Sequence, residues 1–236
     1  MTAALRRVLR AAAWGTVMWA AFPAAALAQA WMGSPAPRLG SWEASGGVTW
    51  SGGYNLGRRA AELTRNIGTG TGAFDQFTTT SKVTPAIGGQ GRLGFYVSRT
   101  VVLEVGVEYL QPKFSSRLAD DTEDAPDVTA TETMSRYVVD GSLVIHLISL
   151  AFAGGQGVPF VSGGGGYLRE LHDGNGLIET GSEYHAGAGL KLWFGPGARR
   201  LGVRADVNLT MRKGAFDFKE ARRTVPTAGL SLAYLF

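Results

Sequence analysis

The feature that most constrains this chain is a two-residue alternation of apolar and polar side chains. It is cleanest in residues 201–212 (LGVRADVNLTMR), where every second residue from Leu201 is apolar and the residues between them include Arg204 and Asp206. Such alternation predicts a β-strand with one apolar and one polar face. A soluble barrel turns the polar face to water, whereas a transmembrane barrel turns the apolar face to lipid, so the alternation alone leaves both open.

Eight stretches of the chain have strand-like sequence, and seven of them alternate clearly. In the remaining stretch, residues 159–171, four consecutive glycines leave the phase undetermined. This recurrence of period two predicts an all-β chain. The predicted strands are residues 42–51, 86–98, 101–110, 135–147, 159–171, 183–194, 201–212 and 226–236.

The first thirty residues differ in character from the rest. Three arginines, the last of them Arg10, precede an apolar run that ends in AQA at residues 28–30, which is typical of a cleavable signal peptide. A single-pass anchor is the alternative, but Pro23 and the alanine-rich end favour cleavage. We therefore expect a signal peptide at 1–30, a linker at 31–40 and a barrel domain at 41–236.

Composition excludes several classes of function. The leader holds three of the 23 basic residues and none of the 19 acidic ones, which leaves a net charge of +1 on the remainder and no reason to expect a nucleic-acid partner. The chain has no cysteine and only three histidines, so we expect neither disulfides nor a transition-metal site. Past the leader, no apolar run approaches the roughly 20 residues of a spanning helix.

The connections between the predicted strands favour the transmembrane barrel. Residues 52–85 and 111–134 form long connections, whereas residues 99–100 and 195–200 form short ones, as in outer-membrane barrels with long outer loops and short inner turns. The polar faces mix glycine with charges of both signs and carry one lysine, Lys191, which suits a narrow filled interior. The sequence therefore predicts an eight-stranded antiparallel up-and-down transmembrane β-barrel; a soluble lipocalin-like barrel is the alternative.

The end of the chain adds a more specific signal, formed by Leu230, Leu232, Tyr234 and Phe236 at two-residue steps. This pattern resembles the C-terminal strand of bacterial outer-membrane proteins. The region from about residue 41 to 236 resembles the small OmpA-like, OmpX-like or OmpW-like barrels. The resemblance implies a bacterial outer-membrane location, surrounding lipid and lipopolysaccharide, and recognition of these four residues by the barrel-assembly machinery. An OmpW-like apolar lumen does not fit, because the predicted lumen is charged.

Charged residues on the polar faces form the candidate site. Buried charges must be paired and hydrogen-bonded, so we expect a salt-bridge network across the lumen. A filled network blocks a channel, whereas a gap in it would allow narrow ion passage. The predicted members are Arg92, Glu104, Glu108, Arg136, Asp140, Arg204 and Asp206.

Two constellations resemble catalytic or metal-binding chemistry, but a structural role fits each of them better. Ser182, Glu183 and His185 suggest a lipase-like site, yet two-residue spacing on one strand predicts only a polar pair that faces the lumen. His172 and Asp173 precede a glycine-rich turn, which accounts for the aspartate. We therefore predict no catalytic, cofactor or metal-binding residues.

Two loop segments carry concentrated charge. Residues 120–127 (DDTEDAPD) are acidic but lack the regular ligand spacing of a calcium loop. Residues 57–65 (GRRAAELTR) suggest a short loop helix whose Arg58, Arg59 and Arg65 pair with lipopolysaccharide phosphate, or serve only as loop charge.

The predicted function is that of a monomeric outer-membrane barrel with a filled lumen, acting in envelope integrity or in surface interactions through its outer loops. A narrow solute or ion pore, a lipid-modifying barrel enzyme and a soluble ligand-binding barrel are the alternatives.

Overall fold

The computed structural model describes residues 39–63, 74–121, 125–172, 177–194, 200–214 and 222–236. The predicted signal peptide and most of the predicted linker lie outside the described residues, so this division of the chain stays a prediction. Within the described part of the chain, no helix is long and apolar enough to span a membrane.

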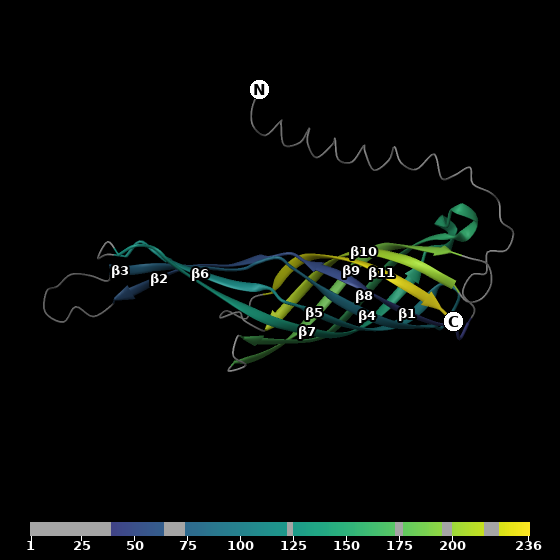
Figure 1. Ribbon diagram of the computed structural model, residues 1–236, viewed down its shortest axis with the longest axis horizontal. Helices are drawn as coiled ribbons and strands as arrows, with labels where there is room; N and C mark the ends of the chain where they lie inside the picture. The colour runs from purple at the N-terminus through teal and green to yellow at the C-terminus, as the bar shows by residue number, and fades with distance from the viewer. Residues whose placement is uncertain (1–38, 64–73, 122–124, 173–176, 195–199, 215–221) are drawn as a thin grey trace, which may run out of the picture.

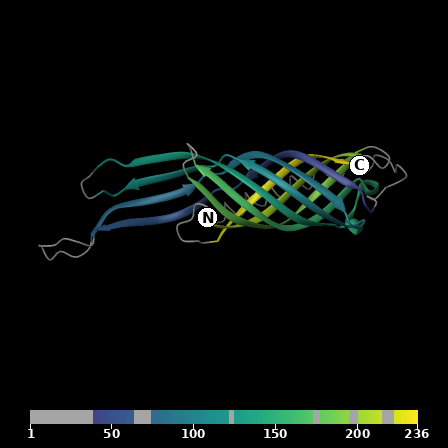
Figure 2. The same cartoon turned by 90° about the horizontal axis from the view of Figure 1, so that it is seen from below.

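Eight antiparallel strands close into a barrel, which confirms the predicted fold (Figures 1 and 2). Neighbours pair in the order β1-β4-β5-β7-β8-β9-β10-β11, and β11 pairs with β1 to close the ring. Closure leaves no barrel strand edge exposed to lipid. The strands are β1 (Trp42–Ser51), β4 (Ala86–Tyr96), β5 (Val101–Leu110), β7 (Val128–His146), β8 (Gly157–His172), β9 (Ile178–Phe194), β10 (Arg200–Gly214) and β11 (Arg223–Leu235).

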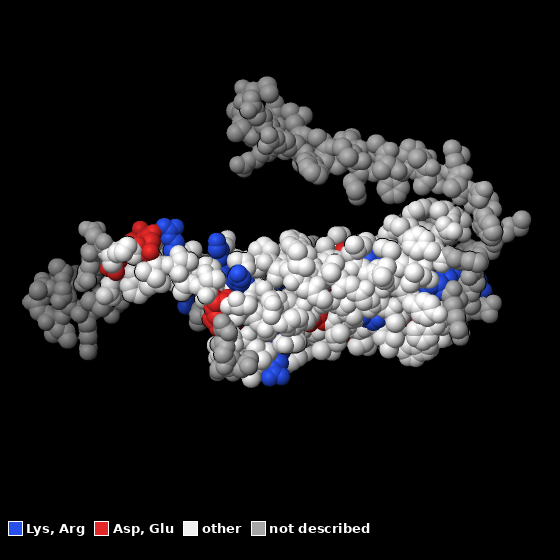
Figure 3. All heavy atoms as spheres, in the orientation of Figure 1, with Lys and Arg blue, Asp and Glu red and all other residues white. Residues whose placement is uncertain are grey.

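The barrel has its apolar faces outside and its charges inside. Val207 and Leu209 on β10 are each 63% exposed, whereas Arg204 on the same strand is 2% exposed. In the space-filling view the barrel wall is almost free of charge, and charged side chains gather toward the ends of the molecule (Figure 3). An apolar outer wall around a polar interior is the arrangement of a transmembrane barrel and the reverse of a lipocalin.

Aromatic side chains lie at both ends of the apolar wall. Near the chain termini, Tyr234 stacks on Phe236 with ring centroids 5.9 Å apart. At the opposite end, Tyr109 and Tyr137 lie 4.9 Å apart. These positions are those of the aromatic girdles that outer-membrane barrels place at the two bilayer interfaces. Leu230 and Leu232 are exposed on the same outer face of β11; recognition of this strand by the assembly machinery stays a prediction.

The structure fixes the phase of the glycine-rich strand β8. Tyr167 faces outward and is 53% exposed, whereas Leu168 and Glu170 are fully buried. Gly166 therefore faces inward, where an added Cβ would overlap the Val139 carbonyl oxygen on β7. Glycine allows β7 and β8 to approach closely at this point.

The two long connections are not irregular loops, as the sequence had suggested. They contain β2 (Tyr54–Leu63), β3 (Phe74–Val83) and β6 (Lys113–Ala119), which join the first part of β7 in a sheet of order β2-β3-β6-β7. This sheet projects beyond the barrel (Figures 1 and 2). We call residues 54–63, 74–83, 113–119 and 128–133 the extension.

The predicted loop helix at residues 57–65 is wrong. Residues 57–63 belong to β2, which pairs with the threonine-rich strand β3, and Arg65 lies outside the described residues. Local helix preference is weak, and cross-strand pairing overrides it here. Because successive strand residues point to opposite faces, Arg58 and Arg59 do not form one cluster.

The barrel end near the termini has compact turns. Residues 97–100 join β4 to β5, and residues 147–156 join β7 to β8 through two short 3-10 helices, η1 (Ile148–Leu150) and η2 (Ala153–Gly155). Short turns face the periplasm in outer-membrane barrels, so the extension lies on the cell-surface side.

Candidate functional site

The interior of the barrel is built in layers, beginning with an apolar layer at the end near the termini. The Phe160 ring, 1% exposed, supports two cations of the next layer: the Arg204 guanidinium carbon lies 4.8 Å from its centroid and the Lys191 Nζ 5.5 Å. Such cation–π contacts stabilise a charge that has left water. The layer comprises Tyr96, Val102, Val144, Val158, Phe160, Trp193, Ala233 and Leu235.

Above this layer, ion pairs cross the barrel. Arg204 Nη1 on β10 donates to both carboxylate oxygens of Glu104 on β5, at 2.7 and 2.8 Å. Lys191 Nζ on β9 lies 2.7 Å from Glu43 Oε1 on β1 and 3.5 Å from Glu104 Oε1. Arg204 Nε also donates to Asp206 at 3.1 Å. Four strands are thus tied through one connected group of charges.

A second group lies around Arg92 of β4. Its Nη2 donates to Glu108 Oε1 at 2.9 Å, and its Nη1 lies 3.6 Å from Asp140 Oδ2. Ser142 Oγ donates to Asp140 at 2.8 Å and lies 3.0 Å from His185 Nε2. The acid of a catalytic triad binds the other imidazole nitrogen, whereas Asp140 Oδ2 lies 3.9 Å from this same Nε2. This geometry therefore differs from that of a catalytic triad.

Nearer the cell-surface rim, the pairs join adjacent strands. Arg136 Nε on β7 donates to Glu170 on β8 at 2.6 Å, and the two residues are direct cross-strand partners. Arg212 Nε on β10 donates to Glu183 on β9 at 2.7 Å, and its Nη1 donates to Ser51 Oγ at 3.1 Å. The two ion pairs follow the wall, whereas the Arg212–Ser51 contact passes over β11 to β1, and Tyr54 of β2 interacts with both arginines.

His172 lies at the same rim. Its Nδ1 is 3.1 Å from Glu132 Oε1 and its Nε2 is 3.6 Å from Glu179 Oε2. Among the residues that the structure describes, no group of three or more histidine, cysteine, aspartate or glutamate side chains could hold a metal ion. The neighbouring Asp173 of the predicted turn lies outside the described residues.

The seven residues of the predicted lumen site fall into three groups. Arg204 contacts Glu104 and Asp206, and Arg92 contacts Glu108 and Asp140, but Arg136 pairs with a residue that the sequence had not indicated. That these residues form a functional site stays a prediction. The additional buried charged residues are Glu43, Glu170, Glu183, Lys191, Arg200 and Arg212.

The sequence had already placed Lys191 and Glu183 on the polar faces, although outside the predicted network. Glu43 could have been found in the same way, because it occupies a polar position of a strand that alternates clearly. Glu170 could not, because the glycines before it hid the phase of β8.

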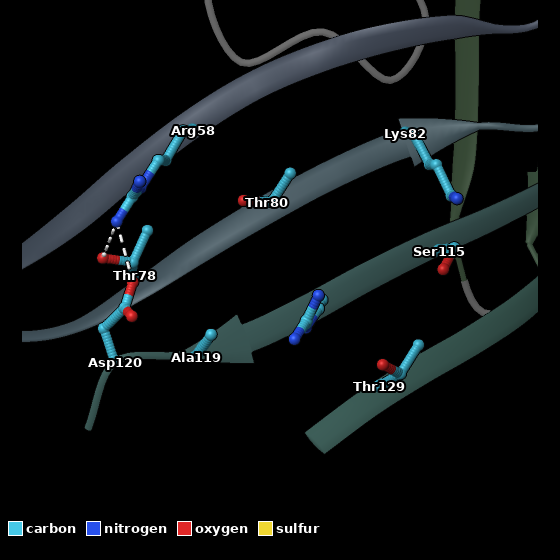
Figure 4. Close-up of a pocket in the computed structure, with 9 residues that line it drawn as sticks. Arg58, Thr78, Thr80, Lys82, Ser115, Ala119, Asp120 and Thr129 are labelled. Carbon is cyan, nitrogen blue, oxygen red and sulfur yellow. Dashed lines mark hydrogen bonds and ion pairs between the residues drawn. The ribbon is translucent and has the colours of Figure 1, made fainter. Parts of the chain in front are cut away.

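A second candidate site lies on the extension, in a hollow of about 420 Å³ (Figure 4). Arg58 points across it from β2, donating to Asp120 Oδ2 at 2.7 Å and to Thr78 Oγ1 at 3.3 Å. Arg117 of β6 pairs with Asp127, which raises the pKa of Arg117 through its hydrogen bond and its charge. The hollow is lined by Arg58, Thr78, Thr80, Lys82, Ser115, Arg117, Ala119, Asp120 and Thr129.

Comparison with known proteins supports the fold. No protein-family model matches this chain, and no curated protein matches it. Outer membrane protein OprG from Pseudomonas aeruginosa is similar in structure, with a TM-score of 0.50 and 8% identity over 85% of this chain and 97% of OprG. Neisserial surface protein A matches with a TM-score of 0.48 and 9% identity over 83% of this chain and 95% of its own.

The closed barrel, with its apolar outer wall and charged interior, defines the class of this protein. Its fold is that of small eight-stranded outer-membrane β-barrels, and its apolar outer wall is the surface that such barrels turn to lipid. Unlike the ligand-filled interior of a lipocalin, the interior of this barrel is occupied by its own paired charges.

Proposed function

We propose that this protein is a closed, non-conducting barrel that anchors the extension at the cell surface, where the extension makes the functional contacts. The observation that supports the closed barrel is the burial of the crossing charges. Glu43, Lys191, Glu104 and Arg204 are only 2%, 1%, 3% and 2% exposed. A continuous file of water through this layer would leave such side chains exposed.

Opening this layer carries a large free-energy cost. A conducting gap requires Arg204 to leave Glu104 or Lys191 to leave Glu43, and a buried charge left without its partner costs about 3–5 kcal/mol. The Phe160 ring blocks the path below both cations. Thermal fluctuation therefore opens the layer rarely, and a pore function is disfavoured.

A catalytic function is also disfavoured. His185 and Ser142 form the one described histidine–serine contact, and they face the interior beside Asp140. Membrane lipid, the substrate that an outer-membrane enzyme meets, lies against the opposite face of the same strands. The extension is the described part that reaches beyond the wall, so we assign the surface interaction to it.

Single-channel recording in planar bilayers tests the closed barrel. Purified, folded protein should give no stepwise current under conditions where a triple variant, Phe160→Ala with Lys191→Ala and Arg204→Ala, does conduct. The triple variant removes the blocking ring and both crossing cations, and so shows that an opened barrel is detectable. Stepwise current from the unaltered protein would overturn the proposal.

A further inference from the structure

The extension presents one face that continues the lipid-facing wall of the barrel. On β7, Tyr137 and Val139 face outward and are 44% and 52% exposed. Thr133, Thr131 and Thr129 have the same parity on this strand and therefore lie on the same side. This face, which we call the outward face, therefore continues the outer, lipid-facing side of β7.

The outward face is basic and rich in hydroxyl groups. One row of cross-strand partners runs Arg58, Thr80, Arg117 and Thr129 from β2 to β7. Lys82 and Ser115 form part of the next row toward the barrel. Lys113 of β6 lies on the same side, so four cations share this face, and Asp120 and Asp127 are the carboxylates in its described ion pairs.

The pairs on this face are open to exchange. The Arg58 and Asp120 side chains are 67% and 65% exposed, and those of Arg117 and Asp127 are 60% and 44% exposed. Exposed ion pairs are weak, so a phosphate can replace the carboxylates. A guanidinium binds phosphate through two parallel hydrogen bonds, which favours that exchange.

The distance of the outward face from the aromatic girdle of the barrel indicates which anion can reach it. From Tyr137, at the aromatic girdle, to Thr129 is eight residues of one strand, or about 26 Å along it. The headgroup region adds only about 5–8 Å to each side of the hydrocarbon core. A phospholipid headgroup therefore stops below the row of Arg58 and Arg117, whereas the long saccharide of lipopolysaccharide extends past it.

The chemistry of the face disfavours a protein partner. Protein interfaces are enriched in aromatic residues, methionine and arginine and depleted in lysine, serine and alanine, so Arg58 and Arg117 by themselves suit either kind of partner. The hollow is lined by threonine, serine, alanine and charged residues, with no aromatic side chain. Hydroxyl groups beside guanidinium groups suit a hydrated, phosphorylated saccharide.

We propose that the outward face binds the phosphorylated saccharide of the lipopolysaccharide molecules around the barrel, with Arg58, Lys82 and Arg117 contacting phosphate. The proposal rests on the proposed function, in which the extension makes the contacts at the cell surface. The ligand of the hollow is then the saccharide of lipopolysaccharide, and the partner of the extension is the lipopolysaccharide next to the barrel.

Titration calorimetry with folded protein in detergent tests this binding, using phosphorylated core oligosaccharide freed of its lipid. A triple variant, Arg58→Ala with Lys82→Ala and Arg117→Ala, should lose at least tenfold in affinity. After phosphatase treatment, the same oligosaccharide should bind the unaltered protein as weakly as the phosphorylated oligosaccharide binds the triple variant. Equal affinity of the triple variant and the unaltered protein, or of the two oligosaccharides, would overturn the proposal.

Matched controls separate this site from general charge effects and from the closed barrel. Arg59→Ala removes the same charge from the same strand but on the opposite face, so its affinity should stay within twofold of the unaltered value, unlike Arg58→Ala. A sulfated glycan that binds as tightly as the phosphorylated saccharide would overturn the commitment to lipopolysaccharide. All variants should keep the heat-dependent gel shift of a folded barrel. The single-channel recordings test the closed barrel separately, so a failure of one proposal can be told from a failure of the other.

Discussion

Arg204 and Glu104 face each other from opposite walls of the barrel, since β10 and β5 are four strands apart in either direction around the ring. Each has a second partner: Asp206 for the arginine and Lys191 for the glutamate. A polar contact here takes the role that apolar packing has in a soluble protein, because it fixes the distance between the two walls. Stability should therefore depend on this pair.

Replacing Glu104 by Gln should destabilise the folded barrel by about 3–5 kcal/mol, because Arg204 would stay buried with one charge partner fewer. Denaturant unfolding in detergent micelles measures the change. The double variant Glu104→Met with Arg204→Met should lose less than the two single variants together, because it leaves neither of these charges unpaired. A Glu104→Gln variant as stable as the unaltered protein would contradict the structural role of this pair.

Arg136 should behave independently of Arg204. Its pair with Glu170 joins adjacent strands near the rim and shares no described partner with the crossing group. The losses caused by Arg136→Met and Arg204→Met should therefore add to within about 0.5 kcal/mol in the double variant. The same unfolding measurement gives this sum, and a larger deviation would show that the layers are coupled.

The sequence predicted the barrel because alternation, loop length and terminal pattern depend only on local order along the chain. It did not predict that Arg136 pairs with Glu170, which was not among the predicted members of the network. Pairing depends on the register between β7 and β8, which the glycines at 163–166 conceal.

The extension shows a second limit of prediction from sequence. Residues 57–63 lack the clear alternation of the barrel strands, because neither face of a sheet in water has to be uniformly apolar. The strand identity of Arg58 and Arg59 comes from pairing with β3, about twenty residues away in the sequence. Local preference could not reveal that the two arginines face opposite ways.

Gly166→Ala should destabilise the barrel by about 1–3 kcal/mol, because an inward Cβ would meet the Val139 carbonyl oxygen and Asp140 Cα, and backbone atoms cannot move away cheaply. Gly141→Ala is the matched control on the neighbouring strand, because an added Cβ there meets nothing within 4 Å. Its stability should equal or exceed that of the unaltered protein. Thermal unfolding of both variants checks the contrast, and equal losses would argue against the close approach of β7 and β8.

Asp120→Asn should strengthen binding of the phosphorylated oligosaccharide. The change removes the carboxylate that pairs with Arg58 and repels phosphate, and asparagine tolerates the left-handed backbone of this residue, whose φ is 55°. An exposed pair contributes at most about 1 kcal/mol, so the gain in affinity should be about fivefold or less. The same calorimetric titration measures it, with the melting temperature as a control for folding. Weaker binding by a fully folded Asp120→Asn variant would show that Asp120 positions Arg58 for the ligand and does not compete with it.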